Sequence, residues 1–338
     1  MEVNSVIVIG GSAGGFQAVA DLMAHMPPDL DTAFFVVVHI SRKSIGSVLV
    51  QYIQKHTPYV CSLATDNGHI KKGHLYVAPP DFHLVVKNGY MRVIRGPHEN
   101  RWRPSIDVLF RSAAATYDSH AIGIVLSGLL DDGTSGMSAI KRSRGICIVQ
   151  EPHDAEFEDM PVNVLNNVAV DYQVPVSEMG YVLDDIFSEP FTNRELLKIP
   201  EDVKIESDIM ERRITDMEEL EKIGTRSNYS CPDCGGALWE MKDDVIPRFR
   251  CYTGHVFTGN LLLEKQAEEL EDSLWISIRM LEERKNLLVR MANLEGGIEE
   301  DEERNKTERA EELGKHIERL KSLLISIGKS SPKTAGFD

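Results

Sequence analysis

The chain has 338 residues, a formal net charge of −16 and a hydrophobic fraction of 42%. This length predicts about two domains. The acidity argues against nonspecific nucleic-acid binding, which needs Lys and Arg to neutralise phosphates. No apolar run reaches the roughly 18 residues that span a bilayer, and the N-terminus lacks the features of a secretory signal. We therefore expect a cytoplasmic protein with no membrane insertion.

Charge density divides the chain into a first part with few charged residues and a second part with about twice the density. Residues 1–190 contain 14 Lys/Arg and 21 Asp/Glu, whereas the remaining 148 residues contain 23 and 32. Such a shift separates a compact unit from charged helices. We predict four segments: a compact unit, a connector, a small Cys/Gly-rich module, and a helical hairpin or coiled coil, at 1–190, 191–228, 229–259 and 260–328.

The first segment alternates short apolar runs with helix-like sequence. Several runs are apolar at every position, which is typical of strands that are covered on both faces. The pattern predicts an α/β fold with a doubly wound, mostly parallel sheet, and such sheets bind ligands at the carboxyl ends of their strands. The predicted strands are Val6–Ile9, Phe34–Ile40, His74–Ala78, Ile122–Ser127, Ile146–Gln150 and Tyr181–Leu183.

A G-x-S-x-G turn centred on Ser12 follows the first predicted strand and precedes a predicted helix. Flanking glycines permit the sharp turn that exposes a nucleophilic serine, and the first helical turn offers N–H groups to an oxyanion. The alternative is a phosphate-binding loop. A dinucleotide loop, however, would need glycine in place of Ser12 and an acidic residue after the second strand. The turn alone leaves both interpretations open.

His39 ends the second predicted strand, so it should lie beside Ser12 at one edge of a parallel sheet. There it could take the serine hydroxyl proton, although a lone histidine at a strand end is more often a core residue. Asp131 and Asp132 follow a later strand. Either one could accept the imidazole N–H, or merely cap the next helix. The residues themselves do not separate the two aspartates.

Five ordered motifs within about residues 4–185 resemble the protein-glutamate methylesterase domain of bacterial chemotaxis. The resemblance implies Ser12 as nucleophile, His39 as base and Asp132, the aspartate directly before glycine, as the acid. The family usually has Thr-Gly-Met-Gly where this chain has Ser-Gly-Leu-Leu at 127–130, which changes the oxyanion and substrate contacts. The motifs are GGSAGG, VVVHI, RPSIDVLFRSAA, LSGLLDDGTSGMSAIK and VQEPHDAEFEDMPVNVL.

The third segment carries C-x2-C followed after 16 residues by C-x3-H, with the ligands Cys231, Cys234, Cys251 and His255. Four protein ligands of these types predict a closed, structural zinc site. The alternative is a set of reduced structural cysteines. Because no ligand comes from residues 1–190, we expect loss of the metal to leave the reactivity of Ser12 unchanged. Stand-alone relatives of the family often carry a similar segment.

The fourth segment has apolar residues at heptad spacing. The two stripes pack against each other by default, although they could instead form a homodimer or bind a partner. Since no receiver domain precedes Ser12, we expect activity to be controlled through this half or a partner and not by phosphorylation of this chain. The stripes are Ala267, Leu270, Leu274, Ile278, Leu281 and Leu288, then Leu313, Ile317, Leu320, Leu324 and Ile327.

Together these features predict a serine hydrolase that needs no catalytic cofactor. The resemblance alone implies the substrate: glutamyl methyl esters, and glutamine amides for deamidation, on a methylated, helical chemoreceptor-like protein. Two alternatives stay open, because a fold does not fix a function. One is a serine esterase or amidase with another substrate. The other is a noncatalytic signalling scaffold that binds partners through its C-terminal helices.

Overall fold

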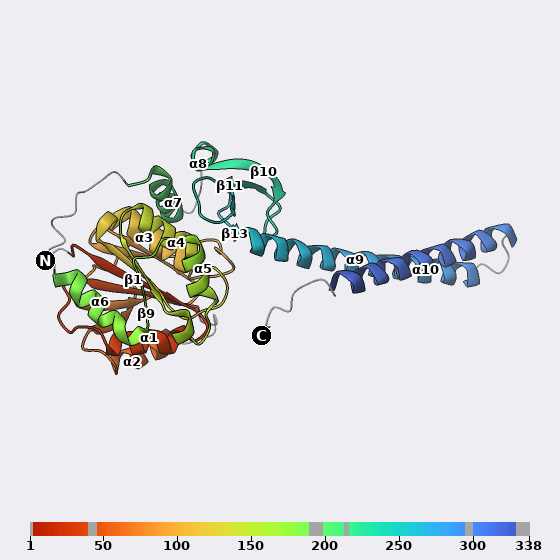
Figure 1. Cartoon of the computed structure of the whole chain (residues 1–338). Helices are drawn as coiled ribbons and strands as arrows, with labels where there is room; N and C mark the ends of the chain where they lie inside the picture. The colour runs from red at the N-terminus through yellow and green to blue at the C-terminus, as the bar shows by residue number, and fades with distance from the viewer. Residues whose placement is uncertain (1–2, 40–45, 189–198, 213–215, 295–299, 329–338) are drawn as a thin grey trace. The chain divides into compact units, whose positions relative to one another are not determined.

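The computed structural model describes residues 3–39, 46–188, 199–212, 216–294 and 300–328. The chain divides into two compact units, residues 1–261 and 262–338, and each is described by itself. The first unit contains a large sheet covered by helices (Figure 1).

The large sheet has seven strands, and every adjacent pair in it is parallel. This confirms the predicted α/β fold with a parallel sheet. The strands at its centre are completely buried, as the uniformly apolar runs predict. The strands are β1 (Val6–Gly11), β2 (Ala33–Val38), β3 (Val60–Leu63), β4 (His74–Val77), β7 (Ala121–Val125), β8 (Ile146–Gln150) and β9 (Tyr172–Val174), in the spatial order β3-β4-β2-β1-β7-β8-β9.

Helices cover both faces of this sheet, and each face has its own apolar core. Alternate residues of β1 divide between the two cores, with Ile7 and Ile9 in one and Val6 and Val8 in the other. The first core includes residues of α1 (Gly15–Ala24), α2 (Gly46–Gln54) and α6 (Val176–Ser188), and the second includes residues of α3 (Ile106–Tyr117), α4 (Thr134–Arg142) and α5 (Asp159–Asn167).

One predicted strand is wrong. Tyr181–Leu183 lies inside helix α6, where Leu183 is fully buried and Tyr181 is 79% exposed. A three-residue apolar run cannot distinguish a strand from one turn of an amphipathic helix. Sequence analysis also missed an antiparallel hairpin formed by β5 (His83–Lys87) and β6 (Tyr90–Ile94). Ile40, at the end of the second predicted strand, lies outside the described residues.

The first unit continues beyond the parallel sheet into two helices and a small antiparallel sheet. The helices are α7 (Glu201–Arg212) and α8 (Met217–Ile223), within the predicted connector. The sheet consists of β10 (Gly224–Ser230), β11 (Ala237–Met241), β12 (Arg248–Cys251) and β13 (Val256–Thr258), in that order. We call residues 224–258 the cysteine module. That the four predicted segments are separate domains with those boundaries stays a prediction.

A buried cluster of charges joins these parts of the first unit. Glu206 on α7 accepts hydrogen bonds from Arg248 of the cysteine module at 2.8 and 2.9 Å, and pairs with Arg111 of α3 at 3.0 Å. Arg111 also pairs with Glu99, and Arg248 pairs with Asp244 at 2.6 Å. Burial raises the pKa of Glu206, but Arg248, Arg111 and Arg250 outweigh it and lower the pKa to about 2.

We expect Glu206→Gln to destabilise the protein by about 3–5 kcal/mol at neutral pH, because it leaves two buried guanidinium groups without their shared carboxylate. A lowered pKa stabilises the fold above the ordinary value of 4.5, and this contribution is lost as pH falls towards about 2. Denaturant unfolding at neutral pH and near pH 3 should therefore show a smaller acid-induced loss in the variant than in the wild type.

Asp208→Asn is the matched control on the same helix. The Asp208 side chain is 46% exposed and lies 3.5 Å from Lys87, so this substitution should lower the free energy of unfolding by less than about 1 kcal/mol. Equal losses for the two variants would contradict the assignment of a stabilising role to the buried cluster.

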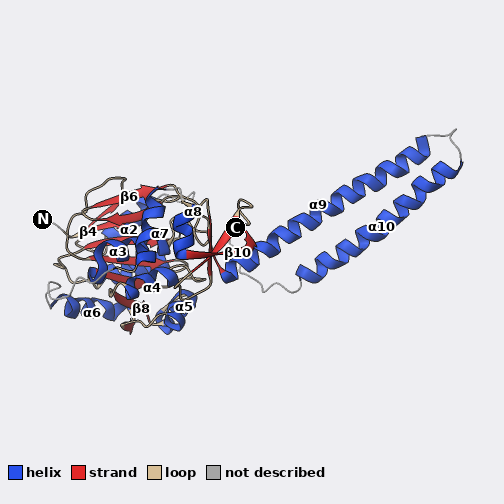
Figure 2. Cartoon of the chain, turned by 90° about the horizontal axis from the view of Figure 1, so that it is seen from above, coloured by secondary structure: helices blue, strands red, loops and turns tan. Residues whose placement is uncertain are grey.

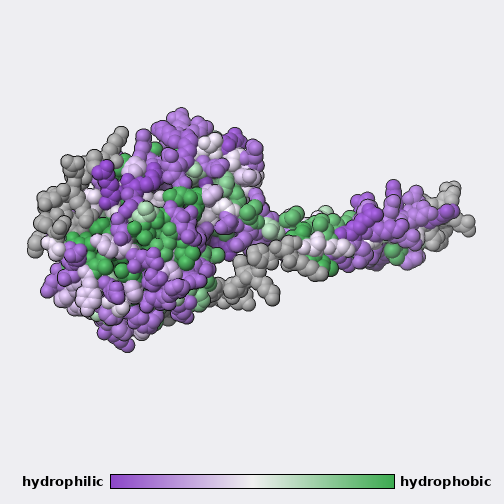
Figure 3. Space-filling model, viewed as in Figure 1, coloured by the Kyte–Doolittle hydropathy of each residue, from purple (hydrophilic) through white to green (hydrophobic). Residues whose placement is uncertain are grey.

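Two long helices, α9 (Gly259–Leu294) and α10 (Glu300–Gly328), lie side by side (Figures 1 and 2). Lys321 of α10 pairs with Glu282 of α9 at 3.1 Å, and Ile278 and Ile317 of the two heptad stripes are buried. Leu270 departs from the predicted stripe, since it is 49% exposed. Figure 3 shows apolar side chains among the hydrophilic surface of these helices. None of the described helices is long and apolar enough to span a membrane.

Candidate active site

Ser12 occupies a tight turn between β1 and α1. Its N–H donates to the Ser127 carbonyl at 3.0 Å, and Gly14 at the helix start has φ +71°, a conformation that favours glycine. The adjacent segment approaches very closely: a Cβ on Gly128 would lie 2.9 Å from the Ser12 Cβ and 2.0 Å from the Met160 sulfur. Two glycines are thus required for this turn, which leaves Ser12 partly exposed.

His39 lies next to Ser12, as the order of the parallel strands predicts. β1 and β2 pair with Gly11 opposite Val38, and the His39 N–H donates to the Gly11 carbonyl at 3.1 Å. The imidazole is buried and its Nε2 lies 2.8 Å from the Asp132 Oδ2. The other ring nitrogen, Nδ1, is buried without a hydrogen-bond partner. In this structure the His39 ring therefore hydrogen-bonds to Asp132 through Nε2, and its Nδ1 does not hydrogen-bond to the Ser12 hydroxyl.

Asp132 and Asp131 differ sharply in their surroundings. Asp131 is half-buried, whereas Asp132 is 1% exposed and contacts His39. The start of α3 surrounds the Asp132 carboxylate with further donors, because the Ser105 hydroxyl lies at 2.9 Å and the Ile106 N–H at 2.8 Å. These donors and the helix dipole stabilise a buried negative charge.

The ionisation of Asp132 follows from these contacts. Burial raises the pKa of Asp132, but the hydrogen bond and charge of His39 and the bonds from Ile106 and Ser105 outweigh it, so the pKa lies below its ordinary value. Burial and the charge of Asp132 raise the pKa of the neighbouring Asp107 well above its ordinary value. At neutral pH Asp132 is thus the carboxylate that can stabilise an imidazolium.

A loop of residues 97–103, which we call the active-site loop, contributes two residues to the site that sequence analysis missed. The Trp102 ring stacks on the His39 imidazole, with the ring centroids 4.0 Å apart and the planes 9° apart. The Asn100 amide donates to the Asp132 Oδ1 at 3.3 Å and to Asp107 at 2.9 Å. The only available signal was the position of the loop directly before the RPSIDVLF motif, which gives neither residue a role.

The segment at 127–130, where the chain departs from the usual family pattern, crosses the serine turn. The Ser127 hydroxyl donates to the Ala13 carbonyl at 2.8 Å and accepts from the Phe157 N–H at 2.9 Å. Leu130 has φ +68°, a conformation that costs a non-glycine residue about 1–2 kcal/mol. The Asn163 amide donates to the Leu130 carbonyl at 2.8 Å and helps to hold this strained position.

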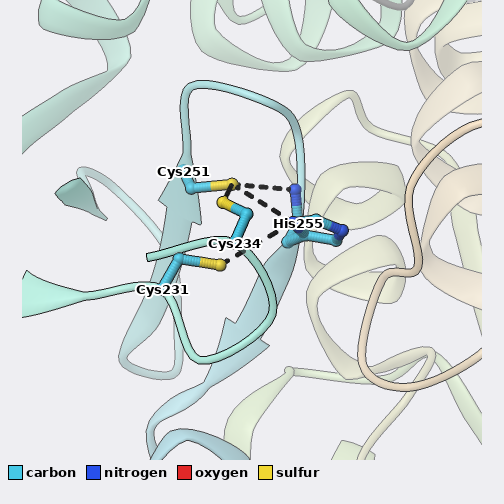
Figure 4. A group of neighbouring side chains, drawn as sticks. All are labelled: Cys231, Cys234, Cys251 and His255. Carbon is cyan, nitrogen blue, oxygen red and sulfur yellow. Dashed lines mark hydrogen bonds between the residues drawn. The ribbon is translucent and has the colours of Figure 1, made fainter. Parts of the chain in front are cut away.

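The four predicted metal ligands gather at one end of the cysteine module (Figure 4). The sulfurs of Cys234 and Cys251 lie 3.8 Å apart, and His255 Nδ1 lies 3.7 Å from the Cys231 sulfur and 3.6 Å from that of Cys251. Zn–S bonds of about 2.3 Å and Zn–N bonds of about 2.0 Å place tetrahedral ligands roughly 3.5–3.8 Å apart. The four ligand atoms therefore fit a tetrahedral ion of this size.

The other two cysteines lie outside this cluster. Burial raises the pKa of the Cys61 thiol to about 11 and that of Cys147 to about 12. Both are protonated at neutral pH and unreactive in comparison with a thiolate.

The cysteine module also contacts the active-site loop directly. The Asn100 N–H donates to the Val256 carbonyl at 3.0 Å, and the Val256 N–H donates to the His98 carbonyl at 3.4 Å. The module and residues 1–190 thus share main-chain hydrogen bonds near His39. All four ligands of the cluster come from the cysteine module and none from residues 1–190, as predicted, and the effect of metal loss on Ser12 stays a prediction.

Comparisons with known proteins match the first part of the chain. A family model described as CheB methylesterase matches residues 7–183. A protein of Leptospira interrogans, provisionally named protein-glutamate methylesterase/protein-glutamine glutaminase, is 34% identical over 52% of this chain and 90% of its own length. Proteins with that name from Maricaulis maris and Sulfurimonas denitrificans are 31% and 34% identical over 52% and 55% of this chain, and 44% and 53% of their own lengths.

A solved structure agrees with these relatives. The CheB methylesterase catalytic domain of Thermotoga maritima is 27% identical to this chain, with a TM-score of 0.52, and the match covers 54% of this chain and 98% of that domain. The serine turn, the strand-end histidine and the buried aspartate all lie within the matched residues. Because the family model covers more than half of the sequence, the chain belongs to the CheB methylesterase family.

Proposed function

We propose that the protein is a serine hydrolase that removes methyl groups from glutamyl methyl esters and deamidates glutamines on chemoreceptor-like proteins. The observation that carries this proposal is the pairing of buried His39 with Asp132 directly beside the Ser12 turn. A nucleophile, a base and a group that orients the base are the requirements for acyl transfer. The names of the relatives support the glutamyl substrate.

In the proposed reaction Ser12 Oγ attacks the ester carbonyl carbon while His39 Nδ1 takes the hydroxyl proton. The first-turn amides of α1 stabilise the oxyanion that develops. The carbon–oxygen bond to the methoxy group then breaks, and methanol leaves with the proton from His39. Water then attacks the acyl carbon while His39 takes its proton. The bond between that carbon and Ser12 Oγ breaks, His39 returns the proton to Oγ, and glutamate is released. With a glutamine substrate the same steps release ammonia.

Asp132 and Trp102 both contact the His39 ring, which becomes an imidazolium cation during the reaction. The carboxylate accepts a hydrogen bond from Nε2–H and stabilises the imidazolium by its charge, while the indole face lies parallel to the ring. An aromatic face attracts a cation by about 0.5–2 kcal/mol. Both contacts favour the protonated imidazole that forms as Ser12 attacks.

Two measurements test the proposed function against its alternatives. A fluorophosphonate probe should label Ser12 in the full chain, and absence of labelling would favour a noncatalytic scaffold. Purified methylated receptors from the same cell should release methanol when they are incubated with the enzyme. Labelling without receptor demethylation would indicate a serine esterase or amidase with another substrate.

We also propose that Cys231, Cys234, Cys251 and His255 hold a structural zinc ion. The ligand atoms all lie within 4.8 Å of one another, and their separations suit a tetrahedral ion. Because all four positions are filled by protein groups, such an ion would shape the module and would not supply a catalytic water.

The full chain should contain about one zinc ion per molecule, since four such ligands fill one tetrahedral site. Elemental analysis of protein prepared without chelators would measure it. Cys231→Ser with Cys234→Ser should release the metal, whereas Cys61→Ser should retain it because Cys61 lies outside the cluster. Wild-type protein without zinc would contradict the assignment.

For α9 and α10 we propose a helical hairpin that engages a helical receptor or a second copy of the chain. The support is an exposed apolar stripe on one side of α9, where Ile276, Met280 and Leu287 are 52%, 59% and 57% exposed. Analytical ultracentrifugation should compare the full chain with a chain that ends at residue 261. If the helices form a dimer, truncation lowers the mass by more than the deleted residues account for. If they bind only a receptor, it lowers the mass by the deleted residues alone.

A further inference from the structure

The active-site loop, residues 97–103, lies between the cysteine module and the catalytic histidine. On one side, the main chain of Val256 accepts from the Asn100 N–H at 3.0 Å and donates to the His98 carbonyl at 3.4 Å. Val256 begins β13, which pairs on its other side with β12. The loop therefore continues the sheet of the cysteine module as an additional edge.

The turn that presents two of the metal ligands also packs against this loop. The Cys251 N–H donates to the His255 carbonyl at 3.0 Å, and the Gly254 N–H donates to the Cys251 carbonyl at 3.0 Å. Gly254 has φ +99°, and a Cβ on it would lie 3.1 Å from the Pro97 ring. The position of the loop is thus coupled to the conformation of the turn that carries Cys251 and His255.

The loop makes a tight turn that needs support from its surroundings. Glu99 and Trp102 exchange two main-chain hydrogen bonds at 3.2 and 2.9 Å, and the two residues between them, Asn100 and Arg101, have φ of +51° and +69°. Consecutive positive φ values define a mirror-image turn that favours Asn and Gly. Arg rarely adopts this conformation, which persists only where neighbouring structure holds it. Val256 holds one side of the turn.

On its other side the same turn places two side chains on the catalytic residues. Trp102 stacks on His39 with the ring centroids 4.0 Å apart, and the Asn100 amide donates to Asp132 at 3.3 Å. These two side chains come from the strained turn itself, so a shift of the turn moves both of them at once.

We propose that metal bound at the cysteine cluster holds the active-site loop in place, so that occupancy of the metal site sets the rate of ester hydrolysis. Trp102 and Asn100 are the positioning residues that transmit the effect to His39 and Asp132. The proposal rests on the proposed hydrolase function. It also replaces the sequence-based expectation that loss of metal leaves the reactivity of Ser12 unchanged.

The first test compares the full chain loaded with Zn²⁺, stripped by a chelator, and reloaded. Stripping should lower kcat for a small soluble ester by about 10–100-fold, the loss expected when catalytic groups shift by about 1 Å, while KM stays within about twofold. The rate of labelling of Ser12 by a fluorophosphonate should fall in parallel. Hydrogen exchange should accelerate at residues 97–103 and 248–258 but not in β1 and β8. Reloading should reverse all three changes.

The second test separates the two positioning contacts from the metal itself. Trp102→Ala in the zinc-loaded chain should lower kcat at least about tenfold with KM unchanged, whereas Trp102→Phe keeps an aromatic face and should restore most of the rate. Trp275→Ala, on α9 and 50% exposed, is the control and should leave the rate unchanged. These variants retain all four metal ligands and should bind zinc as the wild type does.

Each outcome decides between the proposals. Equal kcat and equal labelling of Ser12 in loaded and stripped protein would overturn the coupling, and so would a Trp102→Ala variant with full activity. If the loaded wild type hydrolyses no ester, the hydrolase function fails. In that case hydrogen exchange at residues 97–103 and labelling of Ser12, each compared between loaded and stripped protein, still show whether the metal controls the loop. If stripping also exposes β1 and β8, global unfolding explains the loss and the coupling is rejected.

Discussion

Ser12→Ala is expected to reduce ester hydrolysis by several orders of magnitude, to the residual rate that binding and oxyanion stabilisation alone provide. The substitution removes the attacking oxygen but keeps the Cβ, so the close packing of Ser12 against Gly128 is unchanged. The fold should therefore be retained. Kinetics with a small ester, together with thermal unfolding, would measure both effects.

The exposed Ser177 of α6 offers a matched control, because it carries the same side chain outside the proposed triad. Ser177→Ala should have the activity of the wild type and should be labelled by a fluorophosphonate, whereas Ser12→Ala should not be labelled. A Ser12→Ala protein within tenfold of wild-type activity would require a different nucleophile.

Asp132→Asn should lower kcat by about 10⁴-fold, while Asp131→Asn should have a small effect. Asp132 accepts hydrogen bonds from His39, Ser105 and Ile106, and an amide in its place would turn one NH₂ group towards these donors. The imidazole would then lose both its orientation and the charge that stabilises it. Asp131, one residue earlier, is only half-buried.

The comparison of the two aspartate variants needs a check on folding, because a mispaired amide at a buried site also destabilises the protein. Both should be assayed well below their unfolding temperatures, with circular dichroism confirming the folded state. If Asp131→Asn were the more damaging of the two, the residue that orients His39 would have been misidentified.

Much of the candidate site could be predicted because it depends on the order of strands. Two successive parallel strands place their ends at one edge, so the positions of Ser12 and His39 in the sequence sufficed to place them side by side. The choice between Asp131 and Asp132 depended on the family resemblance, since a one-residue difference in burial is set by the start of α3. That helix contacts Asp132 from about 26 residues away in the sequence.

Other features depend on contacts that leave no local pattern. Trp102 could not be assigned to His39, because a lone tryptophan in a loop indicates neither its depth nor its neighbour. Val256 and Asn100 are far apart in the sequence and are joined through main-chain atoms. Such a contact does not depend on which side chains are present, so the sequence carries no signal for it. Tyr181–Leu183 was wrong for the opposite reason, since a run of three apolar residues fits a strand and a helix equally well.

The buried charges around Glu206 determine where this enzyme can be shortened. A fragment that ended after α6 would match the region shared with the family. It would lack α7 and the Glu206 carboxylate, which pairs with an Arg111 side chain that is buried in the full chain. α3 is also the helix that surrounds Asp132. An expression fragment intended to represent the catalytic unit should therefore extend to residue 261, and weak activity in a shorter one would say nothing about regulation by the helices that follow.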